Sequence, residues 1–485
     1  MSDNDMNFFY TSRQLEKIKI FSSLKLDGMS SDKNHDLQSI SKRKFNELVR
    51  DLNEDIQNIG YNATLNVDGR DIFFNKKIQM EEYAKINNLL TFNYLKESGM
   101  FQLLLYIFEK RSFQVTKAAS ALCYSESYVY KFISRIKLVL NKLDFDIMLV
   151  KDTDQKINLV GNESEIRFVH YILTTILYKG DKWLFRDVSE KKLLLRSKYL
   201  HVDRYSQWSP MVKKKIINLL AIYELPFAKG NGLDGLFGEI NSLAEIIVEH
   251  TIDSEYSDHL KLSNNDIKHL NLLASHLVPE FLSRKEIESI GTKFHLLSDN
   301  MIVYHCTQIL REVANLYSIS RSNYFLLMFR LCNSLAVIHY LEFFKLMPLQ
   351  GVPELSTDLE KSLSEIIDCN LTQYRKSPSF EKIKYNFTQV ISGYIGINEI
   401  GNYKLYIEFT HRPEYKSLVE NSINVTYNKK IFEIVDDYLE ADIIISDSYN
   451  YPEKKYFYFG DVFDSEAWKN LGFYLNGLID GSKNI

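Results

Sequence analysis

The chain has 485 residues and a formal net charge of −4 at pH 7, with 45% hydrophobic and 25% charged residues. This composition is typical of globular protein rather than of a disordered segment, and the length predicts roughly three to five domains. The negative balance argues against a protein that coats nucleic acid non-specifically, because such proteins are basic throughout. A sequence-specific reader needs only a local basic surface.

The cysteines and the N-terminal residues indicate the cellular compartment of the protein. Four cysteines occur, none with C-x-x-C spacing: Cys123, Cys306, Cys332 and Cys369. We therefore expect no zinc ribbon and no disulfide framework, but reduced, buried thiols. The first residues, MSDNDMNFFYTSRQ, are polar, and no run approaches the ~18 apolar residues that span a bilayer. These features predict a cytoplasmic protein without membrane contact, metal or cofactor.

Residues 31–56, SDKNHDLQSISKRKFNELVRDLNEDI, predict a short helix, a turn at 39–41 and a long helix. The long helix has an apolar stripe of Phe45, Leu48, Val49, Leu52 and Ile56. Its start and outer side carry Lys42, Arg43, Lys44 and Arg50. Residues 64–74, TLNVDGRDIFF, predict two short strands joined at Asp-Gly. A hairpin directly after such a helix is typical of a wing, which can lay Arg70 against a DNA backbone.

Residues 113–141, FQVTKAASALCYSESYVYKFISRIKLVLN, repeat this pattern more clearly. The first helix has an apolar stripe of Val115, Ala118, Ala119 and Leu122. Ser125 or Ser127 can cap the second helix. Its inward residues are Val129, Phe132, Ile133, Ile136 and Leu140, and its outward residues are Ser127, Tyr128, Lys131, Ser134 and Arg135. Alternating runs at 147–151 and 156–160, around a turn at 152–154, predict a second wing.

The outward face fits a helix that docks in the major groove, where hydroxyl groups reach base edges and cations reach phosphates. Residues 108–142 hold seven basic residues and two acidic ones, Glu109 and Glu126; the basic ones are Lys110, Arg111, Lys117, Lys131, Arg135, Lys137 and Lys142. Taken alone, this segment also fits an ordinary helical hairpin with a solvated basic face. The upstream copy with its own wing favours two tandem winged helix-turn-helix units.

The predicted DNA contacts divide into two kinds. We expect cations to hold phosphates: Lys42, Arg43, Lys44 and Arg70 in the first unit, and Lys117, Lys131, Arg135 and Lys137 in the second. We expect Ser127, Tyr128 and Ser134 to lie near base edges.

Between 162 and about 401 the pattern is helical, with spans at 165–178, 210–224, 240–252, 264–277, 300–317, 324–344 and 355–370. Two bundles divided around 278–290 fit this length. Gly230–Gly235 matches G-x-G-x-x-G, but it follows a helical pattern rather than a strand, so we expect a loop. His269 and His276 share a helix face without a third ligand, which favours core histidines over a metal site.

After residue 403 strands alternate with helices, which predicts a small α/β domain. Apolar residues alternate at 405–409 and form runs at 443–445 and 456–459, with helices expected at 413–420 and 430–439. Acidic residues gather here: Asp436, Asp437, Glu440, Asp442 and Asp447. The aromatic residues at 449–459 are better explained by strand packing or a subunit interface than by RNA stacking.

This ordered series resembles the Mga, RofA-like and AtxA family of virulence regulators of Gram-positive bacteria. Besides the winged units, residues 159–167, LVGNESEIR, are similar to the family's L-x-G-x-E-x-x-I-R junction. The resemblance implies a mainly α multidomain chain. Its expected parts are two winged helix-turn-helix domains (1–77, 78–161), two helical domains like the phosphotransferase-system regulation domains, or PRD domains (162–282, 283–402), and an α/β domain similar to enzyme IIB (403–485).

The chain departs from the family where phosphate would be carried. Phosphotransfer needs an exposed histidine as nucleophile, yet the helix where some relatives place it reads MVKKKI at 211–216, and the second equivalent position falls near Val390. His201, His259 and His339 are the remaining candidate phosphorylation residues. Where active enzyme IIB proteins carry a cysteine, residues 410–413 read THRP. Phosphocarrier catalysis in this domain is therefore not expected.

We therefore expect a non-enzymatic, DNA-binding transcription regulator, in the first place an activator of virulence or metabolism genes. The resemblance implies a homodimer or higher oligomer, assembled through the regulatory and C-terminal domains. It also implies phosphocarrier proteins of the phosphotransferase system as partners. The alternatives are an RNA-binding antiterminator with PRD domains and a phosphoacceptor protein of the phosphotransferase system.

Overall fold

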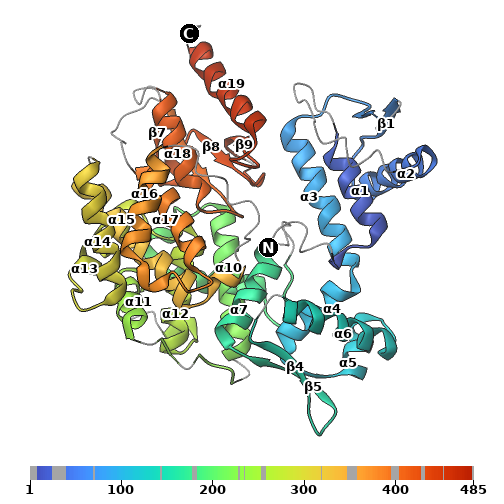
Figure 1. The fold of residues 1–485 in the computed structure, drawn as a ribbon. Coiled ribbons are helices and arrows are strands. Elements are labelled where there is room, and N and C mark those ends of the chain that lie inside the picture. Colours follow the sequence, from blue (N-terminus) through green and yellow to red (C-terminus); the bar gives the residue numbers. More distant parts are fainter. Residues whose placement is uncertain are drawn as a thin grey trace.

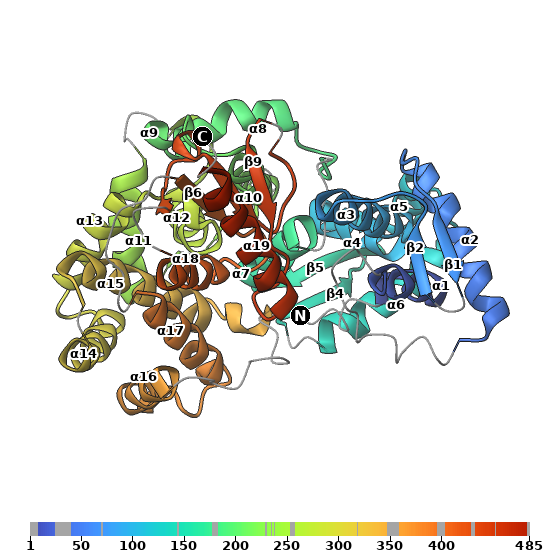
Figure 2. The ribbon, with the colours of Figure 1, turned by 90° about the horizontal axis from the view of Figure 1, so that it is seen from above.

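The computed structural model describes residues 8–24, 40–68, 71–142, 145–176, 183–227, 230–233, 235–236, 238–252, 258–317, 319–346, 358–394, 403–427, 432–451 and 453–482. These residues form nineteen α-helices and three small β-sheets, so the prediction of a mainly helical chain is confirmed. None of the helices described is long and apolar enough to cross a bilayer. In Figures 1 and 2 the two N-terminal units lie on one side and the helical region on the other.

The first unit consists of α1 (Ser12–Ser22), α2 (Lys42–Asn58), the hairpin β1 (Leu65–Asp68) and β2 (Asp71–Phe74), and α3 (Met80–Glu97). The Ser41 hydroxyl caps α2 by accepting the backbone N–H of Lys44 at 3.4 Å. The predicted long helix and wing strands are confirmed, and the stripe from Phe45 to Ile56 is buried. The short helix predicted at 31–38 lies outside the described residues.

Helix α3 packs against the helices of the first unit, whereas the domain boundary predicted after residue 77 assigns it to the second unit. Ile86, Leu90 and Tyr94 of α3 pack in the same apolar cluster as the stripe of α2. The Tyr94 hydroxyl also donates to Asp55 of α2, and Lys17 of α1 pairs with the same carboxylate. The first unit is therefore a three-helix body with a hairpin.

The second unit consists of α4 (Gly99–Lys110), β3 (Ser112–Gln114), α5 (Val115–Leu122), α6 (Glu126–Lys142), β4 (Ile147–Lys151) and β5 (Lys156–Gly161). Its antiparallel sheet has the order β3-β5-β4. Two helices and a hairpin therefore stand where the sequence predicted them. Figure 1 shows the β4–β5 hairpin extending beyond the helices at the foot of the molecule.

Eleven helices form the helical region. They are α7 (Glu163–Tyr171), α8 (Glu190–Ser197), α9 (Val202–Tyr205), α10 (Pro210–Phe227), α11 (Gly238–Thr251), α12 (Asn264–Leu277), α13 (Arg284–His295), α14 (Met301–Leu316), α15 (Arg321–Leu335), α16 (Asp358–Asn370) and α17 (Phe380–Tyr394). Helix α13 begins at Arg284, within the segment 278–290 where the sequence predicts a division into two bundles. The second unit and this region share one continuous apolar core.

The C-terminal domain is a parallel four-stranded sheet with two helices. Its elements are β6 (Tyr403–Glu408), α18 (Tyr415–Thr426), β7 (Phe432–Ile434), β8 (Ile443–Ser446), β9 (Lys455–Tyr458) and α19 (Ser465–Ser482). The strand order is β7-β6-β8-β9. The helix predicted at 430–439 is wrong: residues 432–434 pair in parallel with β6, which buries Phe432, and only the single turn Tyr438–Glu440 is helical.

Two further expectations need correction. Cys306 and Cys332 are buried as expected, but Cys123 and Cys369 are exposed. Asp447 does not belong to an acidic surface, because it is 8% exposed and its carboxylate accepts the backbone N–H groups of Thr410 (2.6 Å) and His411 (3.0 Å).

Candidate nucleic-acid interface

A sharp turn separates α5 from α6. Helix α5 ends at Leu122, and the next residue, Cys123, caps it with a left-handed backbone of φ 59°. The N–H of Tyr124 returns to the carbonyl of Ala119 at 3.0 Å. The Ser125 hydroxyl then accepts the N–H of Tyr128 at 3.4 Å, so Ser125 rather than Ser127 caps α6. The turn therefore directs α6 away from α5 over three residues.

Helix α6 is amphipathic in the predicted way. Its buried residues are Val129, Ile133, Ile136 and Leu140, with Phe132 half-buried. All six residues predicted for DNA contact on this helix are exposed: Ser127, Tyr128, Lys131, Ser134, Arg135 and Lys137. Lys117, on α5, is also exposed. The folded unit thus brings these seven side chains to its surface.

The hydroxyl groups on this surface differ in their availability. Ser134 donates to the carbonyl of Tyr130 at 3.1 Å, and Ser127 lies 3.0 Å from the hydroxyl of Ser125. Tyr128 is 53% exposed, and the ammonium of Lys131 lies 5.4 Å from its ring centroid. Tyr128 is therefore an exposed phenol on α6 that lies beside a cation.

The local positive excess is smaller than the sequence count suggests. Arg111 is 6% exposed and donates to Glu163 at 2.9 Å, and Lys110 donates to both oxygens of Asp187 at 2.7 and 2.8 Å. Both partners lie more than fifty residues downstream, so a local count cannot include them. By contrast, Lys117, Lys131, Arg135 and Lys137 form no ion pair with any carboxylate of the described residues.

The wing of the second unit offers one cation that the sequence prediction missed. Lys151 is exposed at the end of β4 and has no ion pair within the described chain, whereas Lys156 across the turn pairs with Asp154 at 3.3 Å. The alternation along β4, in which Ile147 and Leu149 are buried, would place Lys151 on the buried face, so the strand pattern did not signal its exposure.

The first unit presents fewer free cations than predicted. Lys42, Arg43 and Lys44 are all exposed at the start of α2, but Lys44 pairs with Glu16 of α1 at 2.5 Å. Arg70 lies outside the described residues. Lys42 and Arg43 are therefore the described cations of this set without an ion pair.

The sequence motif at residues 159–167 forms the junction between the second unit and the helical region, and the contacts of its residues explain the motif. Gly161 has φ 138°, and a Cβ there would lie 1.8 Å from the carbonyl oxygen of Asp146. Glu163 accepts hydrogen bonds from Arg111 at 2.9 Å and from Arg167 at 2.8 Å, while Ile166 is buried in the shared core. The junction thus ties α4 and β5 to α7.

Replacing Gly161 with alanine is expected to destabilise the chain by about 1–3 kcal/mol, because an alanine meets both backbone strain and a clash. The midpoint of urea unfolding measures the effect. Gly477→Ala is the matched control, since Gly477 is exposed on α19 and a Cβ there would have no other atom within 4 Å. Equal midpoints for the two variants would contradict the role assigned to Gly161.

The three candidate histidines differ in accessibility. His201 is 2% exposed and lies 2.9 Å from a carboxylate oxygen of Glu286. His339 is half-buried, its Nδ1 lies 2.7 Å from the Ser379 hydroxyl, and burial lowers its pKa. His259 is exposed and stacks on Tyr199 at 4.6 Å. Of the three, His259 meets the exposure that phosphotransfer requires.

Two other sequence signals have structural explanations. The glycines at 230, 232 and 235 lie in the connection from α10 to α11, as predicted, rather than after a strand. His269 is 2% exposed between the hydroxyl groups of Tyr223 and Ser164, and burial lowers its pKa to about 3. It is therefore a core histidine.

Residues 82–173 match the sequence model of the Mga helix-turn-helix domain. The matched segment runs from the first turns of α3 through the second unit to the end of α7, and so includes α5, α6, their wing and the junction. No curated protein matches the chain. The family model supports the resemblance to Mga-type regulators, and it does so over the segment whose surface carries the free cations.

Proposed function

Because residues 82–173 carry a Mga helix-turn-helix domain, we propose that the chain binds double-stranded promoter DNA through α6 and regulates transcription without catalysis. The observation that supports this most directly is the outward face of α6, where Lys131, Arg135 and Lys137 lack carboxylate partners in the described chain. Cations without partners can neutralise phosphates and release counterions. A helix with such a face, followed by a hairpin, fits major-groove docking with a wing on the backbone.

We assign the contacts by position on the unit. Lys117, Lys131, Arg135 and Lys137 hold phosphates, joined by Lys151 on the wing. Tyr128 reaches base edges, with Ser127 and Ser134 beside it. In the first unit we assign phosphate contacts to Lys42, Arg43 and Arg70. Lys44 contributes after release from Glu16.

The finer functional proposals rest on the family resemblance. We propose an activator of virulence or metabolism genes in a Gram-positive bacterium. We also propose a homodimer or higher oligomer built through the PRD-like and enzyme-IIB-like domains, and contacts with phosphocarrier proteins through His259. One structural feature supports assembly: Phe473 is 75% exposed on α19. Aromatic side chains are enriched at protein interfaces relative to the rest of the surface.

The double variant Lys131→Ala, Arg135→Ala is expected to weaken duplex binding about tenfold or more and to reduce the salt slope by about two, since each lost phosphate contact releases about 0.9 fewer counterions. Gel retardation of promoter DNA across a salt series measures both quantities. Lys285→Ala, Lys293→Ala is the matched control, because it removes two exposed cations from α13, outside both N-terminal units.

The same assay discriminates the main alternative. Unlabelled structured RNA is added as competitor to the wild-type complex, and we expect duplex DNA to compete far better. Retardation of duplex by the Lys131 and Arg135 double variant with wild-type affinity and salt slope would sink the DNA-binding assignment. Preferential competition by RNA would replace it with the antiterminator function.

A further inference from the structure

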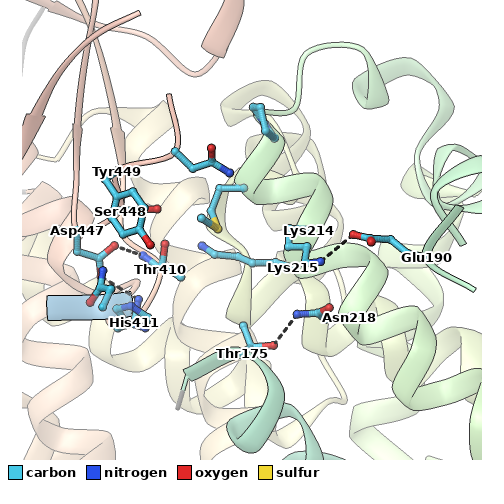
Figure 3. A pocket seen from close by; sticks show the side chains of 14 residues that line it. Thr175, Glu190, Lys214, Lys215, Asn218, Thr410, His411, Asp447, Ser448 and Tyr449 are labelled. Carbon is cyan, nitrogen blue, oxygen red and sulfur yellow. Dashed lines mark hydrogen bonds and ion pairs between the residues drawn. The ribbon is translucent and has the colours of Figure 1, made fainter. Parts of the chain in front are cut away.

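A cavity of about 210 Å³ lies where three parts of the chain meet. Its walls come from α10, from the loops that follow β6 and β8 in the C-terminal domain, and from Asn88 of α3 in the first unit. Figure 3 shows Lys214, Lys215 and Asn218 facing Thr410, His411 and Asp447 across this space. The first unit, α10 and the C-terminal domain thus share one cavity.

The cavity lies at the position where open α/β sheets usually bind ligands. Strand β6 has β7 on one side and β8 on the other, so the order in which the chain adds strands to the sheet reverses between β6 and β8. Thr410 and His411 follow the carboxyl end of β6, and Asp447 and Ser448 follow that of β8. In such sheets the crevice outside the carboxyl ends at this switch point is the preferred binding place.

The strongest unbalanced charge in the wall is that of Lys215. Its side chain is 1% exposed, its ammonium donates to the carbonyl of Phe409 at 3.2 Å, and it has no ion pair within 4 Å among the described residues. Glu408 interacts electrostatically with Lys215 but forms no ion pair with it, and its carboxylate accepts a hydrogen bond from the Ser209 hydroxyl. Burial raises the pKa of Glu408 to about 7. A buried cation without a close counterion is costly unless a ligand supplies one.

The acidic groups of the wall are already satisfied. Asp447 accepts the backbone N–H groups of Thr410 and His411, and Glu190 accepts from Lys214 at 2.7 Å. The hydroxyl oxygen of Thr410, in contrast, is buried without a hydrogen-bond partner in the described structure. The cavity wall therefore contains a hydroxyl group and an ammonium group that can donate hydrogen bonds to a ligand.

We infer that this cavity binds a small organic anion, whose phosphate or carboxylate group pairs with the Lys215 ammonium and whose remaining polar groups meet the hydroxyl and amide side chains of the wall. The volume of about 210 Å³ corresponds to about seven water molecules, because water takes ≈ 30 Å³ per molecule in the liquid, so the cavity suits a small ligand. Because Asn88 of α3 lines the same cavity, the bound anion also holds the first unit against α10 and the C-terminal domain.

Binding is tested on the full-length chain by thermal unfolding and calorimetric titration with glycerol 3-phosphate, inorganic phosphate and citrate, and with neutral glycerol as the reference. We expect the anions to raise the unfolding temperature of the wild type beyond potassium chloride of equal ionic strength, and glycerol to have no comparable effect. A response to phosphates alone, or to citrate alone, identifies which anionic group the cavity takes.

Lys215→Met is expected to weaken anion binding tenfold or more. The matched control is Lys213→Met, on the same helix but outside the cavity, with its ammonium 4.9 Å from the ring of Tyr205. Thr410→Val provides a second variant of the cavity if Lys215→Met does not fold, and it is expected to weaken binding as well. Equal anion responses in the wild type, Lys215→Met and Thr410→Val would overturn the site, as would wild-type unfolding temperatures that follow ionic strength alone.

The regulatory part of this inference rests on the proposed DNA-binding function and has its own readout. At constant ionic strength, a saturating anion is expected to change promoter affinity in the wild type and in Lys213→Met, but not in Lys215→Met. If the chain binds no DNA, the calorimetric result still decides the anion site. If DNA is bound with unchanged affinity while the anion binds, coupling through Asn88 is refuted and the binding site stands.

Discussion

Replacing Arg167 with methionine is expected to lower the free energy of unfolding by about 3–5 kcal/mol, the usual cost of removing one partner from a buried ion pair. The Arg167 side chain has no exposed surface and donates to Asp266 at 2.6 Å and to the backbone carbonyl of Asn231 at 3.1 Å. Its guanidinium carbon also lies 4.5 Å from the ring centroid of Tyr223. Methionine fills much of the volume but leaves the buried Asp266 carboxylate without its cation.

The shift of the urea midpoint at unchanged slope measures this loss. Lys293→Met serves as the control, since it breaks an ion pair with Glu249 whose side chains are 44% and 61% exposed, and such pairs contribute at most about 1 kcal/mol. Adding Asp266→Asn to Arg167→Met is expected to recover part of the stability by removing the stranded charge. A midpoint for Arg167→Met no lower than that of Lys293→Met would contradict the role of this ion pair.

Replacing Glu408 with glutamine is expected to raise the free energy of unfolding above that of the wild type at high pH. We expect this difference between variant and wild type to be about 2–3 kcal/mol larger at pH 8 than at pH 5. Burial, followed by the charge of Glu280, raises the pKa of Glu408 from 4.5 to about 7, against the opposing effects of Lys215, Ser209 and Lys416. One of its oxygens is buried without a hydrogen-bond partner in the described structure. The ionised form is therefore disfavoured in the folded chain.

The sign follows from proton linkage. A carboxyl group whose pKa is raised on folding stabilises the folded chain fully below pH 4.5, and this contribution is lost as the pH rises through 7. Glutamine resembles the neutral acid at every pH, so the variant avoids the loss. Unfolding midpoints between pH 5 and 8 measure the effect, with the exposed Glu440→Gln as control. Parallel pH profiles for wild type and Glu408→Gln would show that Glu408 is not destabilised by burial.

Local patterns in the sequence were sufficient for the helix-turn-helix element. The stripes of α5 and α6 differ from the wing strands in period, and periodicity is a property of neighbouring residues. The hairpins followed from the same kind of signal, an Asp-Gly pair in the first and alternation in the second. Helix α3 was not predicted, because buried residues surround much of it and leave a weak amphipathic pattern. Helix α4 was not predicted either.

The surface charge of the candidate site could not be predicted from the sequence and became clear only in the folded structure. The sequence shows seven basic residues between 108 and 142, but it does not show that Glu163 and Asp187 return to neutralise Arg111 and Lys110. In the same way, Lys44 is engaged by Glu16 across the first unit. These partners are close in space and distant in sequence. The number of cations available to a phosphate is therefore a tertiary property.

By itself, the sequence determined the type of the DNA-reading element and which residues of α6 face outward, since a helix places residues by their spacing alone. Only the tertiary structure decided that residues 432–434 form a strand, because β7 depends on pairing with β6 almost thirty residues earlier. Only it decided that His201 is buried and that Lys215 faces a cavity shared with Asn88 of the first unit. Burial and counterions arise from chain segments that meet on folding, and no local pattern encodes which segments meet.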